Sequence, residues 1–309
     1  MTVKITKPAL NLREELADLR KPSGIAGEAL LRADSVQEQR DLIGAGRKNL
    51  IINGGFDVWQ RGTSFSGNNI YTADRWLTIN GTTSSITKQG NGFHWNDTVG
   101  TSPTASGIEQ RIENLHRYVG SIGSLTVSFK LTVNRANSGT TKFYMWDYDG
   151  SNYVSGSEYV LPENSGTYSH TFTVSGASDG DVFTCSFWLG NGDYILENVQ
   201  LELGSVATEF EHRSYGEELA LCQRYYEKWS GSKAMHPQYS SEASGVYAAA
   251  RELWNDFKVE KRSNPTVTVD GSPTPTAVNA SIYGFGAQVS VASSMASVRI
   301  SEWTADAEL

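Results

Sequence analysis

A period-two alternation of apolar and polar side chains runs through the middle of this chain and limits its fold more than any other feature. In one stretch Leu125, Val127, Phe129, Leu131 and Val133 alternate with threonine, serine and lysine. Successive side chains of a β-strand point to opposite faces, so this pattern predicts a strand with one buried face. The same pattern predicts two further strands, at Tyr168, His170, Phe172 and Val174 and at Phe183, Cys185, Phe187 and Leu189.

Strands of this kind recur between residues 49 and 213, where we expect roughly seven to nine of them. Turn signals separate several, including Asp149-Gly150 and Asn191-Gly192-Asp193, and such residues favour tight hairpins. Thirty glycines and 14 tyrosines also suit short strands joined by turns. A sheet with one apolar face needs a second layer to cover it. The sequence therefore predicts a mainly β protein with a two-sheet sandwich over residues 49–213.

Residues 1–48 have a different pattern, which indicates a short helical arm. Leu12, Leu16 and Leu19 are spaced i, i+4 and i+7, and Pro22 ends this apolar stripe. A second helix is expected from Ser35, with a capping box to the glutamate three residues later. Helices this short are not stable alone. The leucine face therefore packs on the following domain, on another copy of the chain or on a docking surface, or else the arm is frayed, and these alternatives stay open.

Residues 214–309 predict a smaller C-terminal β domain. A short helix is expected within residues 216–226, followed by short strands rich in small residues. The segment 272–276 contains two prolines and reads as a turn, because it is too short for a domain linker.

The composition excludes several classes of partner. The net charge is -8 and no cluster of lysine and arginine is present, so nucleic acid is not expected as a partner. No apolar run of about 18 residues occurs, so membrane insertion is not expected. The two cysteines, Cys185 and Cys222, have no metal-type spacing. We interpret them as buried free thiols of a protein made in a reducing cytoplasm.

Ordered motifs along the chain resemble those of bacteriophage tail fibres and other virion appendage proteins that carry a jelly-roll domain related to carbohydrate-binding modules. The opening of the central region carries most of the resemblance, in NLIINGGFDVWQRG at residues 49–62 and YTADRW at residues 71–76. Further matching motifs are PSGIAGEALLRAD at 22–34, DLIGAGRKN at 41–49, GIEQRIE at 107–113, SLTVSF at 124–129, ENVQLELG at 197–204, FEHRSY at 210–215, ELALCQRYY at 218–226, RSNPTVT at 262–268 and ADAEL at 305–309.

This resemblance implies a non-enzymatic structural protein of a virion, made in the host cytoplasm. It implies a homotrimer that docks on other virion proteins, in the tail or the capsid, through residues 1–48. The β domains would then point outward and recognise host-surface glycan. The sequence itself has no sustained heptad pattern of a trimeric coiled coil.

Aromatic side chains are the candidate glycan contacts, because sugars stack their CH faces on rings while polar neighbours take the hydroxyls. Trp59 and Trp76 belong to the shared opening motif and are interpreted as structural. Two other segments, the hairpin 144–153 and the loop 93–97, are better candidates, and ordinary strand packing is the alternative for both. The residues expected to contact glycan are His94, Trp95, Tyr144, Trp146, Tyr148 and Tyr153.

Charged residues inside the apolar pattern have structural interpretations. Arg61, Asp74 and Arg75 are expected to form a buried or semi-buried ion pair that ties the first strands together, since buried charges need partners. Glu197 shares parity with Val199 and is therefore expected to point inward. Related carbohydrate-binding modules have an aspartate near a structural calcium in an equivalent strand. The resemblance thus makes Glu197 a candidate calcium ligand, and no other cofactor is expected.

Catalytic motifs are not found in the sequence. The five histidines show no metal-binding pattern, and neither a GxSxG motif nor a phosphate-binding loop occurs. A glycosidase needs two opposed carboxylates, and sequence spacing alone selects no such pair. We therefore expect no enzymatic activity. Two alternatives to a glycan-binding fibre stay open: a purely architectural head-fibre or tail-adaptor component, and a surface-glycan hydrolase.

Overall fold

The computed structural model describes residues 48–80, 84–98, 106–113, 124–148, 153–173, 182–235, 249–272, 277–291 and 298–308. The chain divides into two compact units, Met1–Lys48 and Asn49–Leu309. The arm expected at residues 1–48, with Leu12, Leu16 and Leu19, lies outside the described residues, as does the turn expected at Asp149-Gly150.

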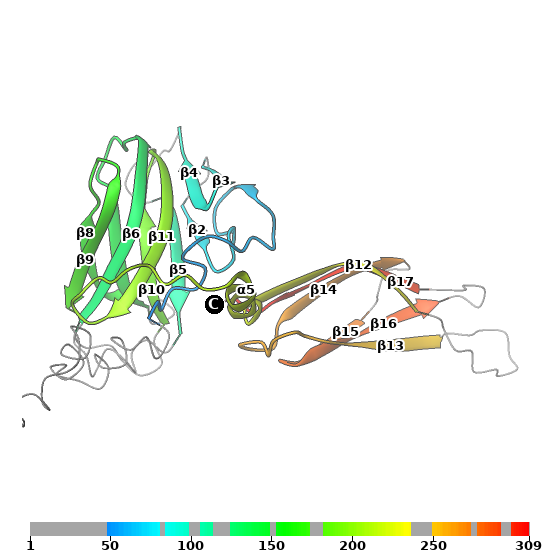
Figure 1. The fold of residues 1–309 in the computed structure, drawn as a ribbon. Coiled ribbons are helices and arrows are strands. Elements are labelled where there is room, and N and C mark those ends of the chain that lie inside the picture. The colour runs from blue at the N-terminus through cyan, green and yellow to red at the C-terminus, as the bar shows by residue number, and fades with distance from the viewer. Residues whose placement is uncertain are drawn as a thin grey trace, which may run out of the picture. The chain divides into compact units, whose positions relative to one another are not determined.

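Antiparallel β-sheets make up most of the second unit, which confirms the expected fold class. Its first part contains a six-stranded sheet and a five-stranded sheet, here called sheet A and sheet B, which face each other as two layers (Figure 1). Sheet A has the order β1-β3-β4-β11-β6-β9, with β1 at Ser64–Ser66, β3 at Ser85–Gln89, β4 at Gly92–Asn96, β11 at Asp193–Leu203, β6 at Ser124–Arg135 and β9 at Gly166–Thr173. Sheet B has the order β2-β5-β10-β7-β8, with β2 at Leu77–Ile79, β5 at Gly107–Ile112, β10 at Val182–Trp188, β7 at Lys142–Tyr148 and β8 at Tyr153–Val160.

The described strands of this region outnumber the roughly seven to nine that the alternation predicted. The difference lies partly in β1 and β2, which have three residues each. Three residues are too few to display a period of two, so the sequence pattern does not reveal them.

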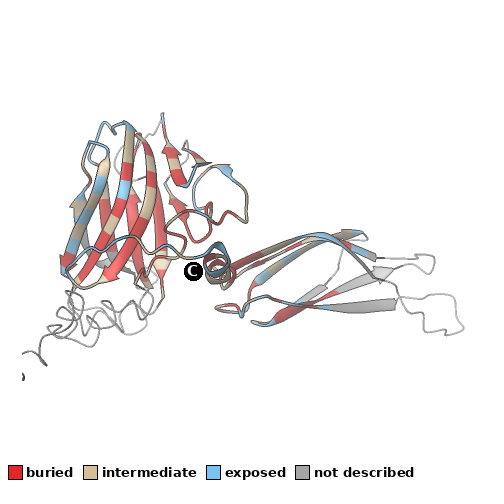
Figure 2. Cartoon of the chain, in the orientation of Figure 1, coloured by how far each residue is buried: buried red, intermediate tan, exposed pale blue. Residues whose placement is uncertain are grey.

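The core of the sandwich lies between the two sheets, where buried residues gather (Figure 2). On β6 the predicted inward residues Leu125, Val127 and Phe129 are all buried. On β10 Phe183, Cys185 and Phe187 are buried in the same way, which confirms the alternation. Phe187 packs edge-on against the rings of Phe129 and Phe143, and these contacts join the two layers. Trp59 and Trp76 belong to this core, as expected.

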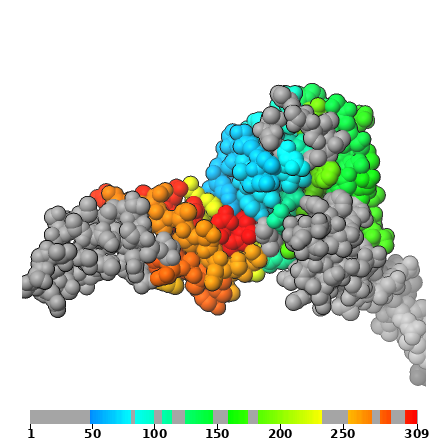
Figure 3. Space-filling model, turned by 180° about the vertical axis from the view of Figure 1, so that it is seen from behind, coloured from blue at the N-terminus to red at the C-terminus, as the bar shows by residue number. Residues whose placement is uncertain are grey.

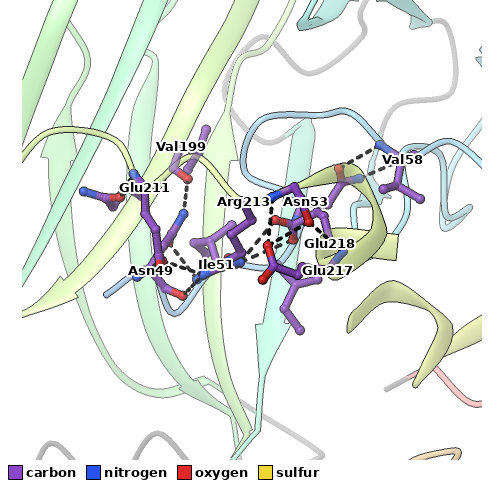
Figure 4. Close-up of polar contacts among 12 residues, drawn as sticks. Asn49, Ile51, Asn53, Val58, Val199, Glu211, Arg213, Glu217 and Glu218 are labelled. Atoms are coloured by element: carbon purple, nitrogen blue, oxygen red, sulfur yellow. Dashed lines mark hydrogen bonds and ion pairs between the residues drawn. The ribbon is translucent and has the colours of Figure 1, made fainter. Parts of the chain in front are cut away.

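Residues 49–58 form a hydrogen-bonded loop that fastens the start of the sandwich to later parts of the chain (Figure 4). The Asn49 side chain donates to the Val199 carbonyl at 3.0 Å and accepts from the Ile51 amide at 2.9 Å. Gly54 is required here, because a Cβ at this position would lie 2.0 Å from the Val199 oxygen. The shared Asn and Gly residues of the opening motif therefore have a structural role.

The C-terminal part contains one described helix and two small sheets. Helix α5 (Tyr215–Gln223) begins with the capping box of Ser214 and Glu217. Sheet C has the order β12-β17-β14, with β12 at Tyr226–Met235, β17 at Val298–Asp306 and β14 at Thr266–Ser272. Sheet D has the order β13-β16-β15, with β13 at Ala249–Asp256, β16 at Gly284–Val291 and β15 at Ala277–Ala280.

Sheets C and D enclose a second apolar cluster, distinct from the sandwich core. Phe285 is fully buried there and packs edge-on against Trp303, with Phe257 beside both rings. The division at residue 213 stays a prediction, because Glu218 of α5 accepts a hydrogen bond from the Asn53 amide of the sandwich at 2.5 Å. Cys185 and Cys222 are free and buried, as expected. None of the described helices has the length and apolar character needed to cross a bilayer.

Candidate functional site

The outer face of sheet B carries an aromatic pair, Trp188 on β10 and Tyr144 on β7. Their ring centroids are 4.4 Å apart and their planes are inclined by 46°. Trp188 is half-buried, whereas Tyr144 is only 8% exposed. Tyr144 therefore packs beneath the Trp188 indole and holds it in place, and Trp188 presents ring surface to solvent.

The strand alternation explains why these rings point outward. Phe187 and Leu189 are fully buried in the core on either side of Trp188, and Phe143 and Met145 flank Tyr144 in the same way. Residues between core residues must project from the opposite face. The neighbour of Trp188 on β5 is Gly107, where a Cβ would lie 1.8 Å from the Phe187 oxygen. Glycine is thus required there, and it leaves no side chain beside the indole.

A charged pair borders the aromatic rings on the β7 side. Lys142 is the cross-strand neighbour of Trp188, and its ammonium lies 2.9 Å from a carboxylate oxygen of Glu158. The same ammonium lies 5.7 Å from the Tyr144 ring centroid. The hydrogen bond from Lys142 lowers the pKa of Glu158, and the bond to Glu158 raises the pKa of Lys142. Both groups are therefore charged near neutral pH.

A polar row continues across the sheet on the β5 side. Ser186 lies between Tyr144 and Glu109 in the strand register. Its hydroxyl donates to a Glu109 carboxylate oxygen at 3.4 Å, and Arg111 donates to the other oxygen at 3.1 Å. Ser186 and Glu109 are themselves buried, so the hydrogen-bonding groups left for a ligand beside the indole are those of Lys142 and Glu158. An indole with a donor and an acceptor at its edge is the combination that suits a sugar ring with hydroxyls around it.

Tyr144 is the predicted contact that the structure places in this site. The backbones of Trp146 and Tyr148 continue β7, and Tyr153 begins the neighbouring strand β8. Trp146 stands opposite Thr184 of β10 in the register. The side chains of Trp146, Tyr148 and Tyr153 lie outside the described residues, so their part in the site stays a prediction.

His94 and Trp95 belong to sheet A and not to this face. Trp95 is fully buried, and its indole nitrogen donates to the Gly190 carbonyl at 2.9 Å. A ring without exposed surface cannot stack on a sugar, so Trp95 is a core residue here. His94 is one-fifth exposed and its ring nitrogens lie 3.1 Å from the Thr87 hydroxyl and 2.9 Å from Asp193. These contacts account for its position as part of a polar network on sheet A.

Glu197 points away from the core, which corrects the inward orientation expected from its parity. A bulge follows it in β11, where the register shifts and Asn198 has a φ of 53°. The bulge changes which residues face inward, so Val199 is buried while Glu197 forms an ion pair with Lys130 at 2.8 Å. One carboxylate oxygen of Glu197 is thus already paired with a lysine ammonium. The described residues also contain no group of three or more acidic, histidine or cysteine side chains suited to a metal, so Glu197 does not fit a calcium site.

Trp188 is the candidate contact residue that the sequence analysis missed. Its signal is present in the sequence, because Trp188 stands between Phe187 and Leu189 and has the opposite parity to the inward residues of that strand.

A second polar cluster joins the sandwich to sheet C. Asp74 is fully buried and lies 3.6 Å from Arg61, so the expected ion pair is present. Its partners extend well beyond the first strands, because Arg61 also pairs with Asp306 at 3.2 Å and Arg75 pairs with Glu308. The red C-terminal residues lie against the blue and cyan part of the sandwich in the space-filling view (Figure 3). Burial raises the pKa of Asp74 to about 6, against the opposing effect of Arg61.

Comparisons with known proteins give structural similarities only. No family model matches the chain, and no curated protein matches it. The chain is similar to a CBM4 structure, with 18% identity and a TM-score of 0.35 over 49% of this chain and 97% of that one. It is also similar to the CBM22-1–GH10 modules of Clostridium thermocellum endo-1,4-β-D-xylanase 10B complexed with xylohexaose, with 14% identity and a TM-score of 0.33 over 52% of this chain and 29% of that one.

A third similar structure is the enzymatically active domain of tailspike protein 4 of bacteriophage CBA120. The identity is 15% and the TM-score is 0.29, over 50% of this chain and 21% of that one. These values describe a likeness, and they carry no ligand or activity over to this chain.

Proposed function

We propose that this chain is a non-enzymatic attachment protein of a phage-like virion that binds host-surface glycan through the outer face of sheet B. The observation that carries the proposal is the Trp188 indole, held on Tyr144 and bordered by the Lys142–Glu158 pair. The order of motifs shared with phage appendage proteins supports the virion role.

The chemistry of the face suits a bound sugar. An indole offers a flat apolar surface for the CH groups of a pyranose, and such aromatic contacts contribute roughly 0.5–1.5 kcal/mol beyond the burial of area. Lys142 and Glu158 supply a donor and an acceptor for sugar hydroxyls at the edge of this surface. The backing by Tyr144 limits the rotamers of Trp188, so less conformational entropy is lost on binding.

The carboxylates beside Trp188 favour binding over hydrolysis. A glycosidase needs a carboxylic acid that is protonated near its working pH, and its pKa is normally raised. Glu158 has a lowered pKa because Lys142 donates to it. Glu109 accepts hydrogen bonds from Arg111 and Ser186. Glu158 is thus held as an ionised acceptor.

Glycan arrays and binding to whole host cells test the proposed function with the purified full chain. We expect retention on cells of permissive hosts and binding to a restricted set of surface glycans. Failure to bind any permissive host rejects the proposal. Release of reducing sugar from the bound glycan supports the hydrolase alternative instead.

The proposal includes a homotrimer docked on other virion proteins through residues 1–48. Deletion of residues 1–48 separates docking from recognition. We expect assembled particles to lose the truncated protein, while the purified truncated protein still binds cells. Loss of cell binding together with loss of docking supports a purely architectural component. Sedimentation of the full chain measures the oligomeric state.

A further inference from the structure

The outer face of sheet D carries an exposed tryptophan, Trp254, next to two glycines of the neighbouring strand. In the register of the sheet Trp254 stands opposite Gly286, and Asp256 stands opposite Gly284. On the other side of Gly286 the neighbour is Asn279 of β15. One row of this face therefore consists of an indole, a glycine and an amide.

The alternation along β13 sets the direction of these side chains. Asn255 and Phe257 are buried toward the second apolar cluster, where Phe285 is also buried. Trp254 and Asp256 lie between these positions and project from the outer face. Trp254 is 50% exposed although it is one of the largest apolar side chains in the chain.

Contacts on two sides fix the indole of Trp254. Its ring nitrogen donates to a carboxylate oxygen of Asp256 at 2.7 Å. A Cβ at Gly284 would lie 3.1 Å from the same nitrogen and 2.5 Å from the Asn255 carbonyl oxygen. The indole thus rests against Gly284, and any larger residue at this position would displace its neighbours. The result is a flat aromatic surface with a defined orientation.

A second exposed aromatic residue lies at the same end of sheet D. Tyr283 is 62% exposed and immediately precedes β16. Its carbonyl accepts a hydrogen bond at 2.9 Å from the amide of Phe257, the residue after Asp256. Among the described residues few large apolar side chains are exposed, and Trp254 and Tyr283 are two of them. Large exposed aromatic side chains near one another are candidates for a binding surface.

We propose that Trp254, Asp256 and Asn279 form a second carbohydrate-binding site, which accepts a neutral pyranose. This inference rests on the proposed glycan-binding function and adds a site in the C-terminal sheets. The indole stacks on the CH face of the sugar, and the carboxylate and amide hydrogen-bond its hydroxyls. One indole hydrogen bond leaves Asp256 with further acceptor capacity.

The charge of the site selects neutral sugars over acidic ones. Asp256 lies at the edge of the ring, and the whole chain has a net charge of -8. A carboxylate beside a bound acidic sugar raises the free energy of the complex, because like charges repel. Neutral hexose oligosaccharides are therefore the ligand class.

Titration of the full chain with neutral and sialylated oligosaccharides, followed by NMR of the indole N–H groups, tests this site. The chain has eight tryptophans, and the Trp254 signal is identified by its loss in Trp254→Phe. We expect neutral oligosaccharides to shift that signal in the wild type and equally in Trp188→Ala. If none of the oligosaccharides shifts the Trp254 signal, the inference is wrong, even if the Trp188 signal shifts. A shift at Trp254 without one at Trp188 retains this site and rejects the one on sheet B.

Variants of the site give a second readout. Trp254→Ala is expected to weaken binding of neutral oligosaccharide to the Trp188→Ala background about tenfold, as for a lost aromatic anchor, while Trp254→Phe keeps most of it. Asp256→Ala is expected to weaken it less. If Trp254→Ala instead dissociates the oligomer in sedimentation and leaves sugar binding unchanged, the surface around Trp254 is an interface between copies of the chain. The inference is then wrong.

Discussion

Arg75 of the sandwich is ion-paired with Glu308, which lies 233 residues further along the chain. Both side chains are almost completely buried, and the Arg75 guanidinium lies 3.5 Å from the centroid of the Tyr225 ring. Arg75 also has a φ of 75°, a conformation that costs a non-glycine residue about 1–3 kcal/mol. The ion pair and the ring contact hold this residue in place, so the YTADRW motif connects the sandwich to sheet C.

Glu308→Gln is expected to destabilise the chain strongly. The substitution leaves Arg75 buried without its charged partner, and breaking a buried pair in this way costs about 3–5 kcal/mol. Urea unfolding measures the change. Glu302→Gln is the matched control, because its partner Lys228 is about one-third exposed and a surface pair contributes at most about 1 kcal/mol. Equal effects of the two substitutions contradict the structural role of Arg75–Glu308.

Asp74 is expected to give the chain a stability that falls between about pH 4 and pH 6. Its folded-state pKa of about 6 exceeds the ordinary value of 3.8, so the folded chain binds a proton that the unfolded chain has lost. The contribution is therefore complete below about pH 4 and is lost as the pH rises through 6, with a size of about 3 kcal/mol. Unfolding at a series of pH values measures it. Asp74→Asn removes this segment of the profile, and an unchanged profile in that variant contradicts the assignment.

Gly54→Ala is expected to destabilise the sandwich by about 1–3 kcal/mol or more, because an added methyl group overpacks a tight site. The new Cβ would lie 2.0 Å from the Val199 carbonyl oxygen. Gly216→Ala is the control, since a Cβ there meets no atom within 4 Å and alanine favours the helix by up to about 1 kcal/mol. The two substitutions should shift the thermal midpoint in opposite directions. A Gly54→Ala variant with an unchanged thermal midpoint would contradict the loop structure described for residues 49–58.

Glu197→Gln is expected to change stability by less than about 1 kcal/mol, because its partner Lys130 is half exposed. Removal of divalent metal by a chelator is expected to leave the thermal midpoint of the wild type unchanged. A midpoint that falls with the chelator and falls again in Glu197→Gln would show that this carboxylate holds a metal ion after all.

The sequence predicted the parts of the fold that depend on local periodicity. The inward residues Leu125, Val127 and Phe129 follow from the alternation, and the same rule applied to Phe187 assigns Trp188 to the outer face. The rule fails at Glu197, because the bulge at Asn198 interrupts the period without a turn signal in the sequence.

Long-range partners were beyond the reach of sequence patterns. The charges at Arg61, Asp74 and Arg75 indicated a buried pair, but nothing local to them identifies Asp306 and Glu308 as partners. The prediction of glycan-contact residues from the sequence failed at Trp95 for the same reason. Trp95 looked like a loop aromatic, and only the pairing of β4 with β11 places it in the core.

The affinity of Trp188→Ala for the host-cell glycan tests the central claim most directly. Titration of the purified full chain carrying Trp254→Ala with the glycan identified on the array gives the dissociation constant of the sheet B site alone. Tyr215→Ala serves as control because Tyr215 is an exposed aromatic on α5, outside sheet B. We predict about a tenfold or greater loss of affinity for Trp188→Ala, as for an aromatic anchor, and none for Tyr215→Ala. Equal affinity of the Trp254→Ala chain with and without Trp188→Ala would contradict a glycan site on the outer face of sheet B.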